Sequence, residues 1–163
     1  MAASIDRLWA PWRSVYLSSP RKGGACIFCA ARRASSDRKH HVVLRGKEAF
    51  VLLNRYPYNN GHVMVAPFRH VGRLERLRPS EWGEMLRLAQ RVMARLQATL
   101  HPQGFNLGLN LGRVGGAGIP GHLHLHIVPR WTGDTNFMPV IGQTKIISQS
   151  LEELWMLLHT PKG

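Results

Sequence analysis

The stretch Gly121-His122-Leu123-His124-Leu125-His126-Ile127-Val128-Pro129-Arg130-Trp131 decides the fold and the chemistry of this chain. Its three histidines alternate strictly with Leu123, Leu125 and Ile127. This two-residue period predicts a β-strand with the imidazoles on one face and the aliphatic side chains on the other. Pro129 is expected to end the strand, because proline has no N–H to donate to a sheet. Three residues that titrate near neutral pH and can act as nucleophile, acid-base group or metal ligand indicate a functional site.

The composition is that of a globular protein, with 44% hydrophobic and 19% charged residues in a chain of 163. We expect a single domain over 1–163, with an N-terminal arm at 1–25 and a C-terminal tail at 132–163. A run of about 18 apolar residues is absent from the sequence, so a membrane span is not expected. The N-terminus has no uninterrupted apolar segment of the secretory type, which favours a cytoplasmic protein.

The net charge of +13 favours anionic partners such as nucleotides, polyphosphate or nucleic acid. A solvated basic surface without a partner explains the same number equally well. Charge therefore narrows the class of ligand but does not select one.

Four further segments have the alternation or the apolar content of strands, and the two short turns between the first three predict antiparallel neighbours. These segments are residues 41–45, 48–54, 62–67 and 105–111. In the last of them, Phe105, Leu107, Leu109 and Leu111 are expected to face inward.

Residues 78–100 form the clearest predicted helix, since Pro79 suits the first helical position and Glu81 suits the positive end of the helix dipole. Its apolar side chains recur at helical spacing. They are Trp82, Met85, Leu86, Ala89, Val92, Met93, Leu96 and Leu100. A capping-box pattern at Ser150 predicts a second, short helix through Leu158.

Cys26 and Cys29 are the only cysteines and form one C-x-x-C motif. This spacing is typical of half of a tetrahedral zinc site, which needs two more ligands from elsewhere. A redox dithiol would also have this spacing, but the surrounding sequence lacks the βαβ pattern of thioredoxin-like proteins.

A glycine-rich loop at residues 112–121 leads directly into the histidines. Glycine lets backbone N–H groups approach an anion closely, and the loop lacks the Gly-Lys-Ser/Thr of a Walker motif. An imidazole beside such a loop can attack phosphorus and divide one displacement into two steps. A neighbouring imidazole on the same face can stabilise the charge that develops on phosphate.

The order His122-Leu-His124-Leu-His126-Ile-Val resembles the signature of the histidine triad (HIT) superfamily of nucleotidyl hydrolases and transferases. The resemblance extends over most of the chain. The other blocks that carry it are 26–29, 53–62, 67–71 and 129–131, and residues 131–137 are similar to the tail of bacterial diadenosine tetraphosphate phosphorylases. It implies the HIT fold, an α+β arrangement with an antiparallel sheet of about five strands, one long helix and a short C-terminal helix.

The resemblance implies that His124 attacks the α-phosphate, that His126 contacts this phosphate and that His62 orients the triad. The nucleotide-contacting positions of the family fall on Asn54 (ribose), on Ile27, Phe28 and Leu52 (base), on Asn110, Ala117 and Gly118 (phosphates) and on Trp131, a tryptophan distinctive of phosphorylase-type members.

Zinc-containing members of the family use positions that correspond to Cys26, Cys29, His70 and His122, so the resemblance implies a structural Zn²⁺. The implied mechanism requires no catalytic metal. Many members carry Gln or Ser just before the triad, whereas residues 118–121 here read Gly-Ile-Pro-Gly. This difference affects the handling of the leaving group and of the acceptor.

The leading hypothesis is an enzyme that cleaves dinucleoside polyphosphates through a nucleotidyl-histidine. Residues 131–137 favour phosphorolysis of diadenosine tetraphosphate to ADP and ATP, with inorganic phosphate as co-substrate. A mononucleotide is a further candidate ligand, and a homodimer or larger assembly is expected.

Four alternatives stay open. Water could be the acceptor, which would make the protein a hydrolase of dinucleoside polyphosphates or nucleoside phosphoramidates. His-x-His on a strand could instead hold a catalytic zinc. A non-catalytic nucleotide sensor would share the binding residues. A zinc-stapled nucleic-acid-binding module would exploit the charge, but it lacks a recognisable motif, so nucleic acid is not the expected partner.

Overall fold

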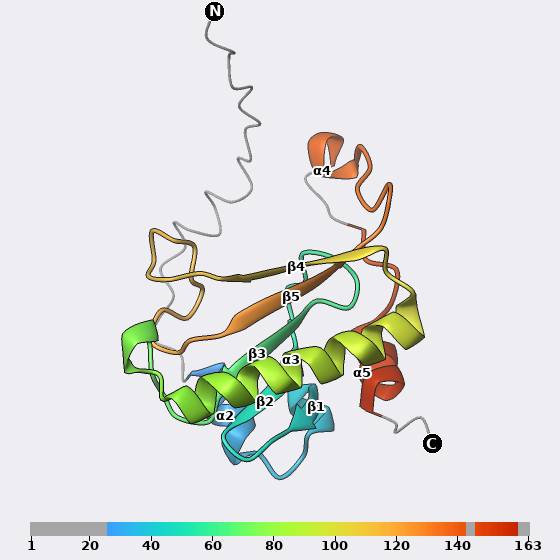
Figure 1. Ribbon diagram of the computed structural model, residues 1–163. Helices are drawn as coiled ribbons and strands as arrows, with labels where there is room; N and C mark the ends of the chain where they lie inside the picture. Colours follow the sequence, from blue (N-terminus) through green and yellow to red (C-terminus); the bar gives the residue numbers. More distant parts are fainter. Residues whose placement is uncertain (1–25, 143–145, 160–163) are drawn as a thin grey trace, which may run out of the picture.

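A five-stranded antiparallel sheet with the strand order β1-β2-β3-β5-β4 forms the centre of the protein (Figure 1). This is a computed structural model, and it describes residues 26–142 and 146–159. The strands are β1 (Val42–Arg45), β2 (Ala49–Leu53), β3 (Val63–Pro67), β4 (Gly104–Leu109) and β5 (Leu125–Arg130). The helices are α2 (Ile27–Arg33), η1 (Arg38–His40), η2 (Leu74–Arg76), α3 (Pro79–Leu100), α4 (Met138–Ile141) and α5 (Leu151–His159). The expected α+β class is confirmed.

The sheet is buried on both faces, and β3 shows why. Val63 and Val65 enter the core under α3, while Met64 and Ala66 enter a second cluster that α2 covers. All five residues of β3 are buried, because the two faces of the strand serve two separate cores. The long helix α3 crosses the front of the sheet, with α2 on the opposite side (Figure 1).

Helix α3 begins as predicted, with Pro79 in its first turn and the Glu81 carboxylate accepting the Arg78 N–H at 2.9 Å. The row of buried side chains on α3 differs from the predicted apolar row at one position. Leu88 is 2% exposed, whereas Leu86, which was expected in the core, is 42% exposed. Successive helical residues point about 100° apart, so the sheet can cover the row that contains Leu88 but not the row that contains Leu86.

Strand β5 begins at Leu125 rather than at His122, and it continues through Pro129 to Arg130. The prediction that Pro129 ends the strand is therefore wrong. Its carbonyl accepts the Asn59 side-chain amide at 3.1 Å on the side of the strand away from β4. In a β-strand the N–H and C=O of one residue point to the same side, so both backbone groups of Pro129 face away from β4. The hydrogen bonds between β4 and β5 therefore need no N–H from Pro129.

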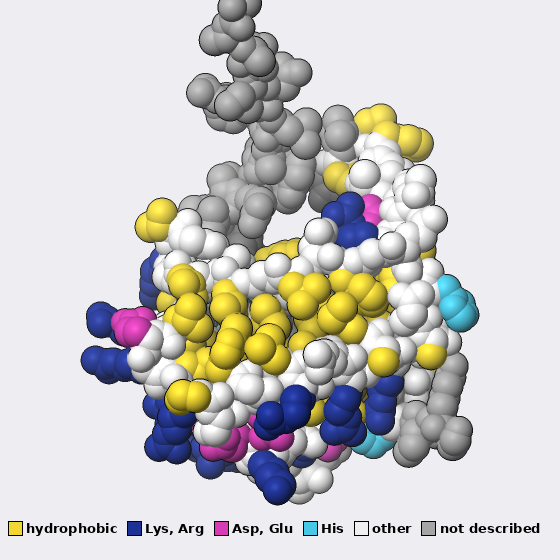
Figure 2. Space-filling view, in the orientation of Figure 1, with side chains coloured by type: hydrophobic (Ala, Val, Ile, Leu, Met, Phe, Trp, Pro, Cys, Tyr) yellow, Lys and Arg dark blue, Asp and Glu magenta, His cyan; other side chains and the backbone are white. Residues whose placement is uncertain are grey.

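The pattern predicted for β4 is wrong for Leu107 and Leu111, which are 47% and 49% exposed. β4 is the edge strand, and α3 lies over β2, β3 and β5, so none of the described helices covers the part of β4 that carries Leu107. A continuous apolar field consequently remains at the surface over α3 and β4 (Figure 2).

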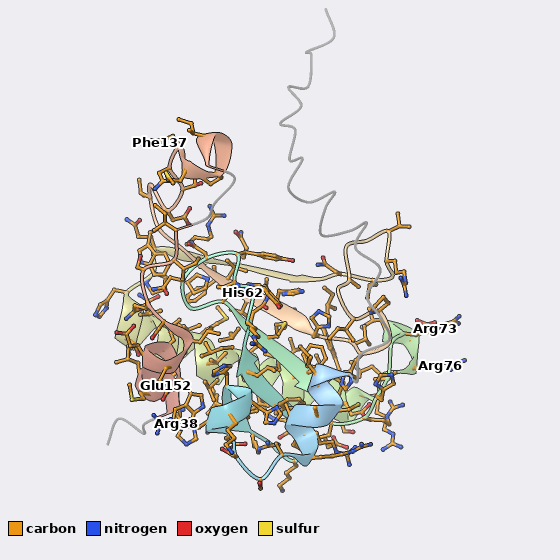
Figure 3. All side chains as sticks on the ribbon, turned by 180° about the vertical axis from the view of Figure 1, so that it is seen from behind. Arg38, His62, Arg73, Arg76, Phe137 and Glu152 are labelled. Atoms are coloured by element: carbon orange, nitrogen blue, oxygen red, sulfur yellow. The ribbon has the colours of Figure 1, made fainter. Side chains whose placement is uncertain are left out.

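Helix α5 confirms the predicted capping box, since Ser150 Oγ accepts the Glu153 N–H at 3.2 Å. Trp155 Nε1 donates to the Val42 carbonyl at 2.8 Å, and Arg38 pairs with Glu152, which together dock this helix on β1 (Figure 3). Helices α2 and α4 were not predicted, because both are too short to show a helical period. The expected arm at residues 1–25 lies outside the described residues.

Within the described part of the chain, none of the helices is both long and apolar enough to span a lipid bilayer.

Candidate active site

The three histidines of the triad are buried in a row on the α2 side of the sheet. His122, His124 and His126 are 1%, 5% and 8% exposed. The rings of His124 and His126 lie 4.8 Å apart between centroids, and Phe28 of α2 lies 4.9 Å from the ring of His122 and 4.8 Å from that of His124. The predicted common face is confirmed, although only His126 belongs to the regular strand.

A single backbone contact fixes the tautomer of His124. Its Nδ1 lies 2.8 Å from the carbonyl oxygen of His122. A carbonyl only accepts, so Nδ1 carries the proton and the neutral ring holds its lone pair on Nε2. A neutral imidazole with a free Nε2 is the form that can attack an electrophile.

A relay of hydrogen bonds from Tyr58 through His62 fixes the tautomer of His126. The Tyr58 backbone N–H donates to His62 Nδ1 at 3.0 Å, and Asn54 Nδ2 lies 3.3 Å from the same atom. His62 Nδ1 is therefore an acceptor, and His62 Nε2–H donates to His126 Nδ1 at 2.9 Å. His126 is left with a proton on Nε2, a buried atom that has no hydrogen-bond partner among the residues described.

This unpartnered N–H has a chemical consequence, because a buried donor without an acceptor is costly. A phosphate oxygen beside His124 would satisfy it. His62, the middle member of the relay from Tyr58 to His126, lies directly before the N-terminal end of β3 (Figure 3).

Burial keeps these rings neutral. It lowers the pKa of His62 to about 3, helped by the nearby His126 and His124, and it lowers the pKa of His126 to about 4. Burial also lowers the pKa of His124, although the hydrogen bond to the His122 carbonyl acts in the opposite direction. At neutral pH the site therefore offers one lone pair and one N–H donor without positive charge on either ring.

The four predicted metal ligands are brought together. The ligand atoms of Cys26, Cys29, His70 and His122 all lie within 4.8 Å of one another. His122 Nδ1 is 3.3 Å from Cys26 Sγ and 3.7 Å from Cys29 Sγ, and His70 Nδ1 is 3.3 Å from Cys29 Sγ. Zn–S bonds of about 2.3 Å and Zn–N bonds of about 2.0 Å separate S and N by about 3.6 Å in a tetrahedron.

The tautomer of His122 also fits a metal. Its Nε2 lies 2.8 Å from the carbonyl oxygen of Pro67, so Nε2 carries the proton and Nδ1 points its lone pair toward the thiols. The donor set of two sulfurs and two imidazole nitrogens is one that zinc prefers. The residues present therefore fit a structural Zn²⁺.

Two glycines allow the segment with His70 to reach the triad. A Cβ on Gly72 would lie 2.6 Å from the carbonyl oxygen of Pro120 and 3.0 Å from the Cα of Gly121, too close for any other residue without a backbone shift. The Leu123 N–H donates to the Val71 carbonyl at 2.7 Å beside this approach. The close packing of these two backbones places His70 against the C-x-x-C motif.

The predicted nucleotide-contacting residues lie in three places. Phe28 and Leu52 are buried in the cluster under α2, whereas Ile27 on the same helix is 46% exposed. Asn54 lies beside His62, as described above.

The phosphate positions Asn110, Ala117 and Gly118 lie in the loop that leads to His122. Asn110 Nδ2 donates to the Gly116 carbonyl at 3.4 Å, and the Ala117 N–H donates to the Gly112 carbonyl at 3.1 Å. The loop is thus closed by its own hydrogen bonds, and the Ala117 N–H is engaged within it.

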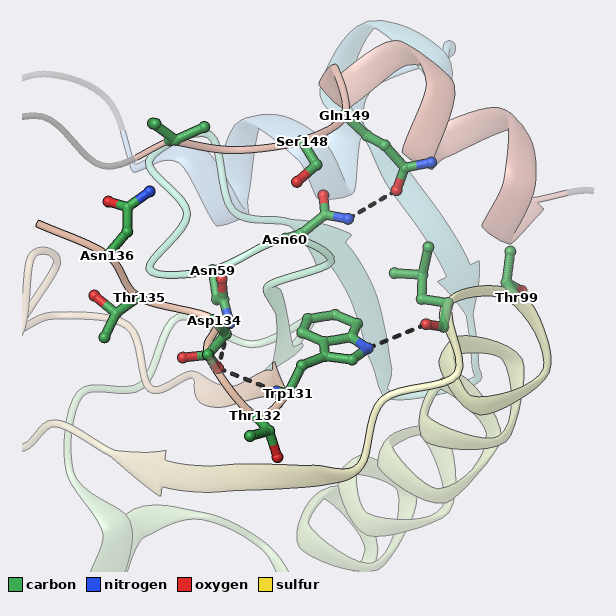
Figure 4. A pocket seen from close by; sticks show the side chains of 13 residues that line it. Asn59, Asn60, Thr99, Trp131, Thr132, Asp134, Thr135, Asn136, Ser148 and Gln149 are labelled. Atoms are coloured by element: carbon green, nitrogen blue, oxygen red, sulfur yellow. Dashed lines mark hydrogen bonds between the residues drawn. The ribbon is translucent and has the colours of Figure 1, made fainter. Parts of the chain in front are cut away.

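Trp131 is not brought to the histidines. Its Nε1 donates to the carbonyls of Leu100 and His101, at 3.3 and 3.2 Å, beyond the C-terminal end of α3. It lines a pocket at the end of β5 (Figure 4).

Sequence reasoning missed Tyr58 and Asp134. The ring of Tyr58 lies 4.7 Å from that of His62, and Asp134 Oδ2 accepts from Arg130 and Asn59 at 2.5 and 2.8 Å. The neighbouring Tyr-Pro-Tyr-Asn-Asn-Gly turn was the signal for Tyr58, but only the fold shows which ring it meets.

Comparison with known proteins agrees with this geometry. Residues 35–133 match the HIT domain family. The chain is 40% identical to an AP-4-A phosphorylase of Mycobacterium tuberculosis, over 96% of this chain and 84% of the relative. It is 29% identical to an uncharacterized HIT-like protein of Mycoplasma genitalium, over 85% and 95% of the two chains. A Zn-bound histidine triad family protein from Mycobacterium smegmatis superposes with a TM-score of 0.66 at 26% identity, over 83% and 91% of the two chains.

The lowered pKa values of His62 and His126 predict acid sensitivity. Above pH 6.5 both rings are neutral in the folded and the unfolded chain, so they do not change stability with pH. Below pH 6.5 the two imidazoles become protonated in the unfolded chain, whereas in the folded chain His126 stays neutral down to about pH 4 and His62 down to about pH 3. The free energy of unfolding therefore falls as the pH drops through this window. Thermal unfolding between pH 8 and pH 4 measures it.

Two variants give this pH profile its controls. His62→Asn removes one titrating ring and should flatten the decline, whereas the same change at exposed His101 should leave it as in the wild type. An equal decline in all three proteins would contradict the assignment.

Proposed function

The chain belongs to the HIT domain family, and on that premise we propose that it cleaves dinucleoside polyphosphates, with diadenosine tetraphosphate split by inorganic phosphate into ADP and ATP. The observation that carries the proposal is the pairing of a bare His124 Nε2 with the unpartnered His126 Nε2–H. The similarity to an AP-4-A phosphorylase over 96% of the chain selects the substrate class.

In the first step His124 Nε2 attacks the α-phosphorus, and an N–P bond forms as the P–O bond to ATP breaks. The Nδ1 proton stays on the ring, held by the His122 carbonyl, which stabilises the positive charge that the imidazole acquires. The His126 N–H donates to a phosphate oxygen as charge develops there. His62 acts on His126 as a positioning residue.

In the second step an oxygen of inorganic phosphate attacks the same phosphorus from the side that ATP has left. The N–P bond breaks, ADP departs and His124 regains its lone pair. The atoms balance as diadenosine tetraphosphate plus phosphate giving ADP plus ATP. Water in place of phosphate would give AMP plus ATP, and a hydrolase of this kind is the second candidate; residues 118–121, which read Gly-Ile-Pro-Gly, do not select between the two acceptors.

The nucleotide roles proposed for these residues are those that the family resemblance implies. Asn54 is assigned to the ribose beside His62, and Ile27, the exposed member of its group, is assigned with Phe28 and Leu52 to the base. The loop residues Asn110, Ala117 and Gly118 are assigned to the phosphates. Trp131 is assigned to substrate at a distance from the triad.

A structural Zn²⁺ held by Cys26, Cys29, His70 and His122 belongs to the proposal. A bound zinc ion would cross-link α2, the segment after β3 and the start of the triad, and it is not a reactant. The donor spacing and the tautomer of His122 support this assignment. Both cysteines are free thiols in the structure, which is compatible with the cytoplasm as the compartment.

The active assembly is proposed to be a homodimer that buries the apolar field over α3 and β4 (Figure 2). Leu86, Leu107 and Leu111 are each more than 40% exposed there. The free edge of β4 lies beside them, and a twofold axis would pair this surface with itself.

We expect His124→Asn to reduce turnover by about 10⁴-fold or more while the protein stays folded, because the variant has no imidazole lone pair. Incubation with diadenosine tetraphosphate, with and without phosphate, resolves the products by chromatography. ADP plus ATP formed only with phosphate supports the phosphorylase, and AMP plus ATP supports the hydrolase. Wild-type protein quenched without phosphate should carry one adenylyl group by intact mass. Full activity of His124→Asn would contradict the proposed mechanism.

The purified protein should contain about one zinc ion per chain, by elemental analysis. Cys29→Ser and His70→Ala should each lose the metal and melt at a lower temperature, because a ligand set of three holds zinc less tightly. The matched control His101→Asn should keep both the metal and the melting temperature. Full zinc content in the two ligand variants would contradict the site.

Leu107→Asp should convert the dimer into a monomer of 18.4 kDa, because it places a charge in the apolar field. Light scattering after gel filtration measures the mass. Leu157→Asp, at a 43% exposed leucine of α5 outside this field, is the matched control and should remain dimeric. An unchanged mass for Leu107→Asp would place the interface elsewhere.

A further inference from the structure

A pocket lies at the C-terminal end of β5, separate from the histidine triad, and we propose that it binds an uncharged purine nucleoside group. The inference rests on the proposed function, in which this group is the distal nucleoside of the dinucleoside polyphosphate. The cavity measures about 530 Å³, within the range of small-molecule sites. Residues from four segments line it, at positions 59–60, 99–100, 131–136 and 146–149 without 147 (Figure 4).

The charge of the lining selects the class of ligand. The described lining side chains are mainly amides and hydroxyls with one indole, and neither lysine nor arginine is among them. The one carboxylate, Asp134, already accepts from Arg130 Nε at 2.5 Å and from Asn59 Nδ2 at 2.8 Å. In a chain of net charge +13, a pocket without free positive charge suits the uncharged end of a nucleotide rather than its phosphates.

Asn60 supplies the polar contact. Its Oδ1 is buried and has no hydrogen-bond partner among the residues that the structure describes, while its Nδ2 donates to Gln149 Oε1 at 2.8 Å and keeps a second N–H. A side-chain amide offers an acceptor and a donor side by side, which is the arrangement that pairs with the N6 amino group and N7 of adenine. A buried acceptor without a partner is unfavourable, and an adenine amino group would satisfy it.

Trp131 supplies the apolar wall. Its Nε1 donates to two carbonyls, those of Leu100 and His101, and these contacts fix the plane of the ring at the pocket (Figure 4). A purine can stack on a fixed indole irrespective of its hydrogen-bonding edge. Stacking therefore contributes affinity, and Asn60 contributes selectivity.

The position of the pocket connects it to the reaction. Asn59 and Asn60 belong to the turn that ends at His62, so the same turn serves the pocket and the triad. Trp131 follows His126 by five residues, about 17 Å of extended chain. β5 ends at Arg130, so Trp131 lies beyond the strand, where β5 no longer separates the two faces of the sheet. The chain of phosphates together with the ribose of the second nucleoside, rather than the phosphates alone, would bridge this length and carry the base into the pocket.

Kinetics with two substrates tests the inference. Diadenosine tetraphosphate and adenosine 5′-tetraphosphate share the half that reacts with His124, but only the first has a distal nucleoside. The wild type should favour the dinucleotide in kcat/KM by about 5- to 150-fold, the range that stacking of one base supports. Trp131→Leu, which removes the stacking surface, should bring this ratio close to one, and Asn60→Leu, which removes only the polar contact with the base, should lower it in part. Gln97→Leu makes the same kind of change on the exposed surface of α3 and should keep the wild-type ratio.

A titration with adenosine separates the two sources of the nucleoside. The indole N–H resonance of Trp131, assigned with Trp131→Phe, should shift on addition of adenosine in the wild type, and Asn60→Leu should need more adenosine for the same shift. A shift together with the changed kinetic ratio identifies the distal half of the substrate. A shift without a changed ratio identifies a free nucleoside as the ligand.

Equal kcat/KM values for the two substrates in the wild type, together with an unmoved Trp131 resonance, would overturn the inference. The same holds if Asn60→Leu slows both substrates equally and the resonance does not move. Absence of turnover of either substrate by the wild type would instead reject the proposed function, and the adenosine titration would still decide the pocket.

Discussion

The hydrogen bond from His124 Nδ1–H to the carbonyl of His122 is the contact on which the rest of the site depends. It leaves the lone pair of His124 on Nε2, where it can react. The side chain of His122 is held in turn by the Pro67 carbonyl on one nitrogen and faces the two cysteines with the other. One residue thus joins the candidate metal cluster through its ring to the candidate nucleophile through its backbone, so the geometry of one cannot change without the other.

Burial gives the site its electrostatic character. The chain carries a net charge of +13, yet the rings that would handle phosphate are neutral at physiological pH, because the protein interior disfavours their protonated forms. Directed hydrogen-bond donors therefore replace positive charge at the reacting group. The Tyr58 N–H starts the relay that aims one such donor, and the aromatic ring of the same residue packs on His62.

The helices and strands could be predicted from the sequence where a single helical or strand period of apolar residues dominated the segment. The alternation in residues 62–67 and the helical stripe in residues 78–100 both match the structure, because each element meets the core along one regular surface. The errors at Leu86, Leu107 and Pro129 have a common cause. In each case the outcome depends on which neighbour covers or pairs with the residue. The sheet under α3 is too narrow to cover Leu86, no described helix covers Leu107 on the edge strand, and β3 does not extend along β5 as far as Pro129.

The sequence by itself determined the chemistry available to this protein: three alternating histidines, a C-x-x-C pair, a glycine-rich loop and the two histidines at positions 62 and 70. These follow from residue type and short-range spacing, which the chain carries without folding. Only the tertiary structure decided which nitrogen of each ring holds the proton, since that depends on carbonyls and N–H groups contributed by other segments. It also separated Trp131 from the triad and formed a pocket around it from four distant segments, because packing brings together residues that no sequence period connects.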